Sequence, residues 1–80
     1  MFYFTYVLKS LKDDRMYIGW TNNLRNRIES HNKGNVESTA ERRPLQLIYY
    51  EACNSRDSAI KRERFFKTGF GRRYLKNRTK

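Results

Sequence analysis

Two β-prone runs near the start of the chain constrain its fold more than any other feature. The first spans residues 2–8 and reads Phe-Tyr-Phe-Thr-Tyr-Val-Leu, and the second spans residues 16–20 and reads Met-Tyr-Ile-Gly-Trp. Aromatic and β-branched residues favour strands, and a short polar segment around Asp13 separates the two runs. The pattern therefore predicts a β-hairpin, with Tyr6 in its first strand and Tyr17 in its second.

The rest of the chain predicts helices and one more strand. Polar residues at 21–23 are suited to cap a helix that ends near Gly34, and a polar, aperiodic loop follows over residues 35–44. Residues 45–50 return to strand character, and a second helix begins after Ser55. Gly69 and Gly71 interrupt that helix, and residues 72–78 form a short terminal one. We expect one domain over residues 1–80, with a thin sheet covered by helices.

The chain is strongly basic, and the charge is concentrated at one end. It has 18 Lys and Arg against 8 Asp and Glu, a formal charge of +10. Residues 61–80 hold nine basic residues and one acid, Glu63, so this segment has a charge of +8 and residues 1–60 have +2. Such a field favours a polyanion, with nucleic acid first and an anionic membrane surface second. The alternative is a solvated face that keeps a small protein dispersed.

Several classes of protein are disfavoured. Cys53 is the one cysteine, so neither an internal disulfide nor a disulfide-linked partner is expected, and one Cys with one His cannot fill a structural zinc site. The sequence has no apolar leader and no run that approaches the roughly 18 to 20 apolar residues of a membrane span. The expectation is a cytoplasmic protein with no membrane partner.

Glu63 is the acidic residue whose position most needs an explanation. It lies three residues after Ile60 and three before Phe66, so it belongs to the apolar face of its helix. A partly buried carboxylate is costly unless it is paired or binds a metal, and a hard divalent cation with mostly water ligands suits a single glutamate. The alternative is an ion pair with Arg27, Arg62 or Arg64.

Arg27 and His31 lie four residues apart in the first predicted helix, and so share one face. A guanidinium suits the charge that develops at phosphorus during displacement, and an imidazole can relay a proton near neutral pH. The phenols of Tyr6 and Tyr17 can act as bases only with a cation nearby, because a free phenol has a pKa of roughly 10. For the histidine and both tyrosines, the alternative is a purely structural role.

Taken together, these residues resemble the GIY-YIG nuclease superfamily, in particular its small stand-alone bacterial proteins, over nearly the whole chain. Residues 4–6 read Phe-Thr-Tyr where the family has Gly-Ile-Tyr, so only the tyrosine is kept, and residues 17–19 match the second triplet as Tyr-Ile-Gly. Residues 23–27 with His31 resemble the family's arginine helix, and residues 59–63 resemble its metal-binding helix. The lost Gly and Ile supply no chemistry.

The resemblance implies a fold and roles for these residues. The fold is α+β, a three-stranded antiparallel sheet flanked by helices, with the site on one sheet face between the two main helices. Glu63 holds one Mg²⁺ or Mn²⁺, Arg27 stabilises the transition state, and Tyr6 acts as general base or positions water. Tyr17 and His31 assist, and Asn77 matches a family asparagine that supports the site. The products carry a 5′-phosphate and a 3′-hydroxyl.

The function implied is a metal-dependent endonuclease that acts on DNA in repair or recombination. Family nucleases that cut chosen sites join this domain to a separate DNA-binding part, and we expect the basic segment to replace it. It then gives affinity with little sequence preference, so selection is by structure. The predicted nucleic-acid-binding residues are Lys61, Arg62, Arg64, Lys67, Arg72, Arg73 and Lys76.

Two other functions compete with this one. The first is a nucleic-acid-binding module that does not cleave, or that cleaves only with a partner; it binds in a salt-sensitive way that ignores divalent metal. The second is an RNA-binding or RNA-processing protein, in which exposed Phe65, Phe70 or Tyr74 stack on unpaired bases. The usual role of such rings is core packing.

Overall fold

The computed structural model describes residues 1–79 of the chain. Along the chain the elements are β1 (Tyr3–Ser10), β2 (Met16–Thr21), α1 (Leu24–Asn32), the 3₁₀ helix η1 (Glu37–Arg42), β3 (Leu45–Cys53), α2 (Arg56–Phe66) and α3 (Gly69–Arg78). The three strands form one antiparallel sheet in the order β2-β1-β3. The predicted hairpin and the α+β class are therefore confirmed.

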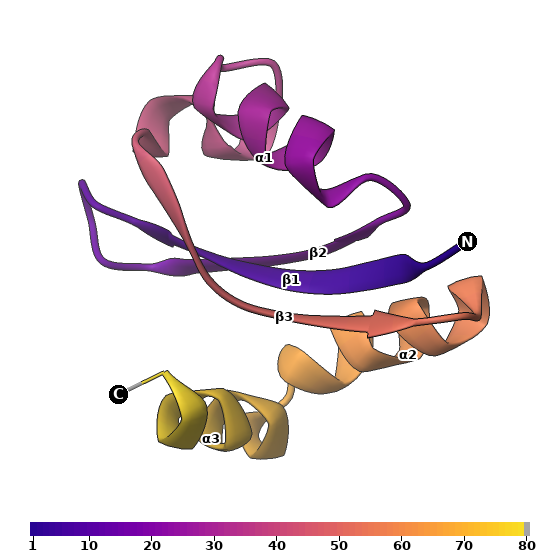
Figure 1. The fold of residues 1–80 in the computed structure, drawn as a ribbon. Helices are drawn as coiled ribbons and strands as arrows, with labels where there is room; N and C mark the ends of the chain where they lie inside the picture. Colours follow the sequence, from indigo (N-terminus) through magenta and orange to yellow (C-terminus); the bar gives the residue numbers. More distant parts are fainter. Residues whose placement is uncertain (80) are drawn as a thin grey trace.

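Helices cover both faces of this sheet (Figure 1). The helix α1 lies over one face, and α2 and α3 lie over the other. On the α1 side the buried residues Tyr6 and Leu8 pack with Ile28, whereas on the other side Val7 packs with Phe66. Because successive strand residues point to opposite faces, β1 supplies side chains to both clusters and forms the centre of the molecule.

Side-chain caps set the beginning of each α-helix. Asn23 accepts a hydrogen bond from the backbone N–H of Asn26 at 3.2 Å, and Ser55 accepts one from Ser58 at 3.3 Å. The terminal helix begins at Gly69 and not at residue 72, because Thr68 serves as its N-cap. The loop expected over residues 35–44 contains η1, a short 3₁₀ helix.

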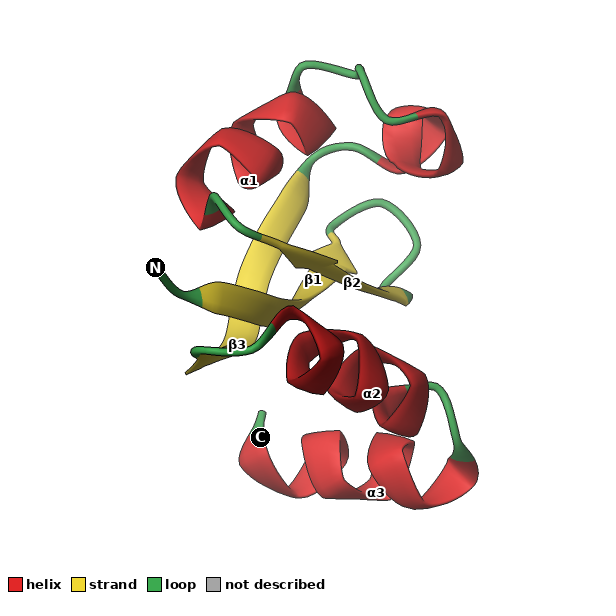
Figure 2. Ribbon diagram, turned by 90° about the vertical axis from the view of Figure 1, so that its right-hand side faces the viewer, coloured by secondary structure: helices red, strands yellow, loops and turns green. Residues whose placement is uncertain are grey.

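The close approach of α2 and α3 depends on Gly71. This glycine is buried, and a Cβ built on it would overlap the backbone carbonyl of Phe65. The absent side chain lets the first turn of α3 lie against the end of α2, as Figure 2 shows from a second direction. Gly71 therefore fixes where the basic side chains of α3 project.

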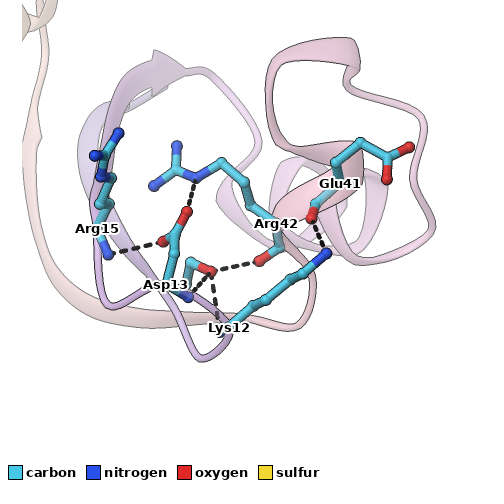
Figure 3. A network of polar contacts seen from close by, with 6 residues as sticks. Lys12, Asp13, Arg15, Glu41 and Arg42 are labelled. Atoms are coloured by element: carbon cyan, nitrogen blue, oxygen red, sulfur yellow. Dashed lines mark hydrogen bonds and ion pairs between the residues drawn. The ribbon is translucent and has the colours of Figure 1, made fainter.

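Polar contacts tie the hairpin turn to η1 (Figure 3). Arg42 donates from Nε to Asp13 Oδ2 at 3.1 Å, and Lys12 donates from Nζ to the carbonyl oxygen of Glu41 at 3.0 Å. The backbone N–H of Arg15 donates to the other oxygen of Asp13 at 2.9 Å. The hydrogen bonds from Arg15 and Arg42 lower the pKa of Asp13, the Arg15 bond most of all. They hold η1 beside the sheet, which matters because η1 also contributes to the site.

No helix within residues 1–79 is both long enough and apolar enough to cross a membrane.

Candidate active site

The hydroxyl of Tyr6 reaches across β2, the outer strand of the sheet. Tyr6 pairs with Gly19 in the β1–β2 register, and its ring is 1% exposed. A Cβ on Gly19 would lie 2.6 Å from the Tyr6 hydroxyl and 2.8 Å from Cζ. Only a glycine therefore leaves room for the phenol above β2, and this is a physical reason for the third residue of the Tyr-Ile-Gly triplet.

Arg27 and His31 meet Tyr6 at this hydroxyl. Arg27 donates from Nε to Tyr6 Oη at 3.4 Å, and Tyr6 Oη lies 2.9 Å from His31 Nε2. Both partners come from the inner face of α1, because residues four apart in a helix lie one above the other. The expectation that Arg27 and His31 both face the sheet is confirmed, and His31 is fully buried.

Thr39, in η1, completes a directed series of hydrogen bonds. Its Oγ1 lies 2.8 Å from His31 Nδ1 and 3.4 Å from the carbonyl oxygen of Val36. The guanidinium can only donate, so Tyr6 accepts from Arg27 and gives its own proton to Nε2. His31 then carries its hydrogen on Nδ1 and donates it to Thr39, which donates to Val36. Every polar atom in the series has a partner with one consistent tautomer.

The surroundings shift the pKa values of these groups. Burial lowers the pKa of His31 to about 4, and the nearby charge of Arg27 adds to this effect. Burial also raises the pKa of Tyr6, against the opposing effect of the Arg27 hydrogen bond. The hydrogen bond to Tyr6 raises the pKa of Arg27. At neutral pH the site therefore holds a neutral imidazole, a protonated phenol and a guanidinium cation.

Tyr17 stands beside this series at the edge of the sheet. Its ring centroid lies 4.9 Å from that of His31 and 6.4 Å from that of Tyr6, and the side chain is partly buried. The structure thus gathers Tyr6, Tyr17, Arg27 and His31 into one cluster. Sequence reasoning missed Thr39, since a threonine in a polar loop gives no signal of its own.

Glu63 lies on the face of the sheet opposite to Arg27 and His31, and acts on Tyr6 through its charge. It lies on α2, its side chain is 21% exposed, and its charge contributes to the raised pKa of Tyr6. Its ion-pair partner is Lys67, at 3.6 Å, rather than any of the three arginines considered from the sequence. The two main helices lie on opposite faces (Figure 1), so the expected location on one face between them is wrong. Because α2 packs against both β1 and β2, the charge of Glu63 still acts on Tyr6.

Glu63 is the single carboxylate among the predicted site residues. Within residues 1–79 no three His, Cys, Asp or Glu side chains come together as a metal-binding group. Glu63 therefore offers one carboxylate, and Mg²⁺ is often held by one or two carboxylates with water and substrate phosphate as further ligands. The contact with Lys67 is a partly exposed pair, which contributes little to stability and is easily exchanged.

The predicted basic residues divide into two groups. Arg62 donates two hydrogen bonds to Glu51, at 2.9 and 2.8 Å, and its guanidinium lies 4.7 Å from the ring centroid of Phe66. It is engaged inside the fold between α2 and β3. The other six are exposed: Lys61, Arg64, Lys67, Arg72, Arg73 and Lys76.

Asn77 and the aromatic residues of the last two helices lie apart from the cluster. Asn77 is exposed near the end of α3, and α3 packs against α2 and not against α1. Phe65 and Tyr74 pack against the core beside Phe66, whereas Phe70 is 76% exposed. Of the three rings considered for base stacking, Phe70 alone is largely exposed.

Comparison with known proteins adds independent findings. The family model described as the GIY-YIG catalytic domain matches residues 2–77. A UPF0213 protein from Pediococcus pentosaceus is 48% identical over 67 residues, which cover 82% of this chain and 68% of the relative. A UPF0213 protein from Clostridium perfringens is 42% identical over 65 residues, covering 80% of this chain and 69% of the relative.

A solved structure is also similar. The solution NMR structure of a UPF0213 protein from Bacillus halodurans superposes with a TM-score of 0.58 at 28% identity. The match covers 96% of this chain and 84% of that one. With the family model matching almost every residue, the chain belongs to the GIY-YIG family, a nuclease superfamily, among its small UPF0213 proteins.

Proposed function

We propose that this chain is an endonuclease that hydrolyses phosphodiester bonds in DNA with one divalent cation, and that it selects substrates by structure rather than by sequence. The observation that supports this most is the directed series from Arg27 through Tyr6 to His31 and Thr39. A series that only supported the fold would not need a guanidinium cation on the phenol, nor a carboxylate whose charge acts on that phenol.

Tyr6 and His31 act together on the proton of the attacking water. Tyr6 is protonated at neutral pH because its pKa is raised, and its proton already points at the lone pair of His31 Nε2. As Tyr6 takes a proton from water, its own proton passes to His31. The water oxygen bonds to phosphorus, the bond from phosphorus to the 3′ oxygen breaks, and that oxygen takes a proton from solvent. The imidazolium, with a pKa of about 4, then loses its proton readily.

Arg27 serves the phosphate. One of its nitrogens holds Tyr6 in place, and the remaining N–H groups of the fork are available to the oxygens that gain charge as phosphorus becomes five-coordinate. The contact to Tyr6 is long, at 3.4 Å, so it constrains the guanidinium only weakly. A cation held by Glu63 would neutralise charge on the same phosphate.

The proposed substrate class is supported by the positive charge of the chain and by the exposed basic side chains that can contact phosphates. A formal charge of +10, with seven exposed basic residues between positions 61 and 79, favours contact with phosphates, which positions a substrate without reading its bases. Selection among DNA substrates is then by structure, and the proposed forms are branched, nicked or single-stranded DNA. We therefore propose that the activity serves DNA repair or recombination.

The test is a cleavage assay on supercoiled plasmid and on labelled single-stranded and branched DNA, with Mg²⁺, Mn²⁺ or chelator. Glu63→Gln keeps the shape of the side chain and removes its charge, and we expect it to abolish cleavage while DNA binding persists. Glu37→Gln, at an exposed position in η1, makes the same charge change and should cleave normally. Metal-independent binding with no cleavage by the wild type would favour the non-catalytic binding module instead.

A further inference from the structure

Three grooves meet at Arg72 on the side of the sheet that carries α2 and α3, two of them along the β2 edge and one across the sheet toward β3. The first has a volume of 270 Å³ and is lined by Tyr17 of the catalytic cluster, by Lys67 and by Arg72. The second, of 600 Å³, extends from Arg72 to Arg15 at the hairpin turn. The third, of 690 Å³, extends from Arg72 to Lys76. Arg72 therefore stands where all three meet, and the first of them begins at the catalytic cluster.

The charges along these grooves leave an excess of positive side chains. Two acids line them, and both have partners: Asp13 pairs with Arg42 at 3.1 Å and Asp14 with Lys9 at 3.8 Å. Within residues 1–79, Arg72 forms no ion pair, and neither do the side chains of Arg15 and Lys76. We call these three residues the edge track. An uncompensated cation row beside a hydrolytic site is suited to a chain of phosphates.

Arg72 and Arg73, which follow Gly71, allow specific contacts in these grooves to be distinguished from attraction by the overall positive charge. Arg72 and Arg73 are both exposed in the first turn of α3, but only Arg72 lines the grooves. Successive helical residues differ by about 100° in direction, so the neighbours project over different surfaces. A contact with a bound strand would need Arg72, whereas attraction by net charge would use either residue equally.

We propose that a nucleic-acid strand leaves the catalytic cluster at Tyr17 and continues through the grooves that meet at Arg72, where the edge track contacts its phosphates. This inference rests on the proposed function for the position of the reacting phosphate. It adds the path of the strand and names Arg72 as the residue that holds it. The contacts are to phosphates, so the path carries no base sequence preference.

The experiment measures binding without turnover. A fluorescein-labelled single-stranded DNA oligonucleotide is titrated with wild type, Arg72→Ala and Arg73→Ala in EDTA, between about 50 and 200 mM salt. We expect Arg72→Ala to weaken binding about tenfold at the lowest salt, as for the loss of a charged hydrogen bond. Its slope of log K against log salt should fall by about 0.7, the value for one phosphate contact on a single strand. Arg73→Ala removes the same charge from the general basic field, and it should weaken binding and change the slope clearly less than Arg72→Ala does.

A second pair of variants repeats the comparison with lysines. Lys76→Ala, in the track, should weaken binding more than Lys61→Ala, which is exposed on α2 and lines none of the three grooves. Circular dichroism melting shows whether each variant is folded, and Arg72→Gln replaces Arg72→Ala if the alanine variant is not.

Equal losses from Arg72→Ala and Arg73→Ala would overturn the edge track, and so would a wild type that does not bind DNA. The outcome is separate from that of the proposed function, since binding in EDTA requires no cleavage. If cleavage depends on Glu63 but the two arginine variants lose binding equally, the proposed endonuclease activity stands and the edge track is wrong. If Arg72→Ala loses more binding than Arg73→Ala but the wild type cleaves no substrate, the edge track stands and the proposed endonuclease activity is wrong.

Discussion

Acidification should destabilise this protein through His31, its only histidine. The folded imidazole has a pKa of about 4, against an ordinary value of 6.5 in the unfolded chain. A base whose pKa is lowered by folding binds its proton more readily when unfolded. The stabilisation is therefore fully present above about pH 6.5 and is lost as the pH falls toward about 4, where the folded form also becomes protonated.

The size of the effect follows from the two values. At about 1.36 kcal/mol per pKa unit, the interval from 6.5 to about 4 corresponds to a loss of about 3 kcal/mol. The folded state of a chain of 80 residues has a free energy of unfolding of only about 4 to 12 kcal/mol. One buried imidazole thus accounts for a large part of the acid sensitivity.

The assay is urea unfolding followed by Trp20 fluorescence at several pH values, for wild type and His31→Gln. Carboxylates such as Glu51, whose pKa is lowered chiefly by its hydrogen bond with Arg62 against the effect of burial, titrate in both proteins and cancel in the difference. The free energy of unfolding of the wild type minus that of the variant should fall by about 3 kcal/mol between about pH 7.5 and pH 4. A difference that does not change with pH would refute the assignment of a neutral, buried His31.

Three further substitutions test the geometry of the site and the fold. Gly19→Ala should cost about 1 to 3 kcal/mol by crowding the Tyr6 ring, and should lower cleavage about 100-fold through displacement of its hydroxyl; normal cleavage kinetics would contradict the close approach. Tyr6→Phe should cost about 1 to 3 kcal/mol in urea unfolding, because it leaves His31 Nε2 without its partner, and should lower cleavage by about 100-fold or more. Gly71→Ala should lower the free energy of unfolding by about 3 kcal/mol, because its methyl group overlaps the carbonyl of Phe65, and an unchanged melting temperature would show that α2 and α3 separate easily.

Local patterns predicted most of the secondary structure. Aromatic and β-branched runs gave the hairpin, and capping side chains placed the beginnings of α1 and α2, because both signals act within a few residues. The start of α3 was misplaced by treating Gly69 and Gly71 as breaks. Their roles differ: Thr68 caps the helix ahead of them, and Gly71 is required by contact with α2, which a linear sequence does not reveal.

For the site as well, short-range patterns predicted some residues, and only the tertiary structure revealed others. Helical spacing alone placed Arg27 and His31 on one face, and the ordered triplets and helices pointed to the family and so to Tyr6 and Glu63. No sequence pattern indicated Thr39, because its role depends on the contact between η1 and α1.

By itself, the sequence determined the strands and helices, the basic charge and the family, all of which depend on residue type and short spacing. The tertiary structure alone decided that Glu63 acts on Tyr6 from the face of the sheet opposite to α1. It also decided that Arg62 turns inward to Glu51 while Arg72 faces the grooves. The physical reason is that direction in space depends on packing between elements distant in the chain, and burial, which sets the protonation of Tyr6 and His31, arises only when they pack.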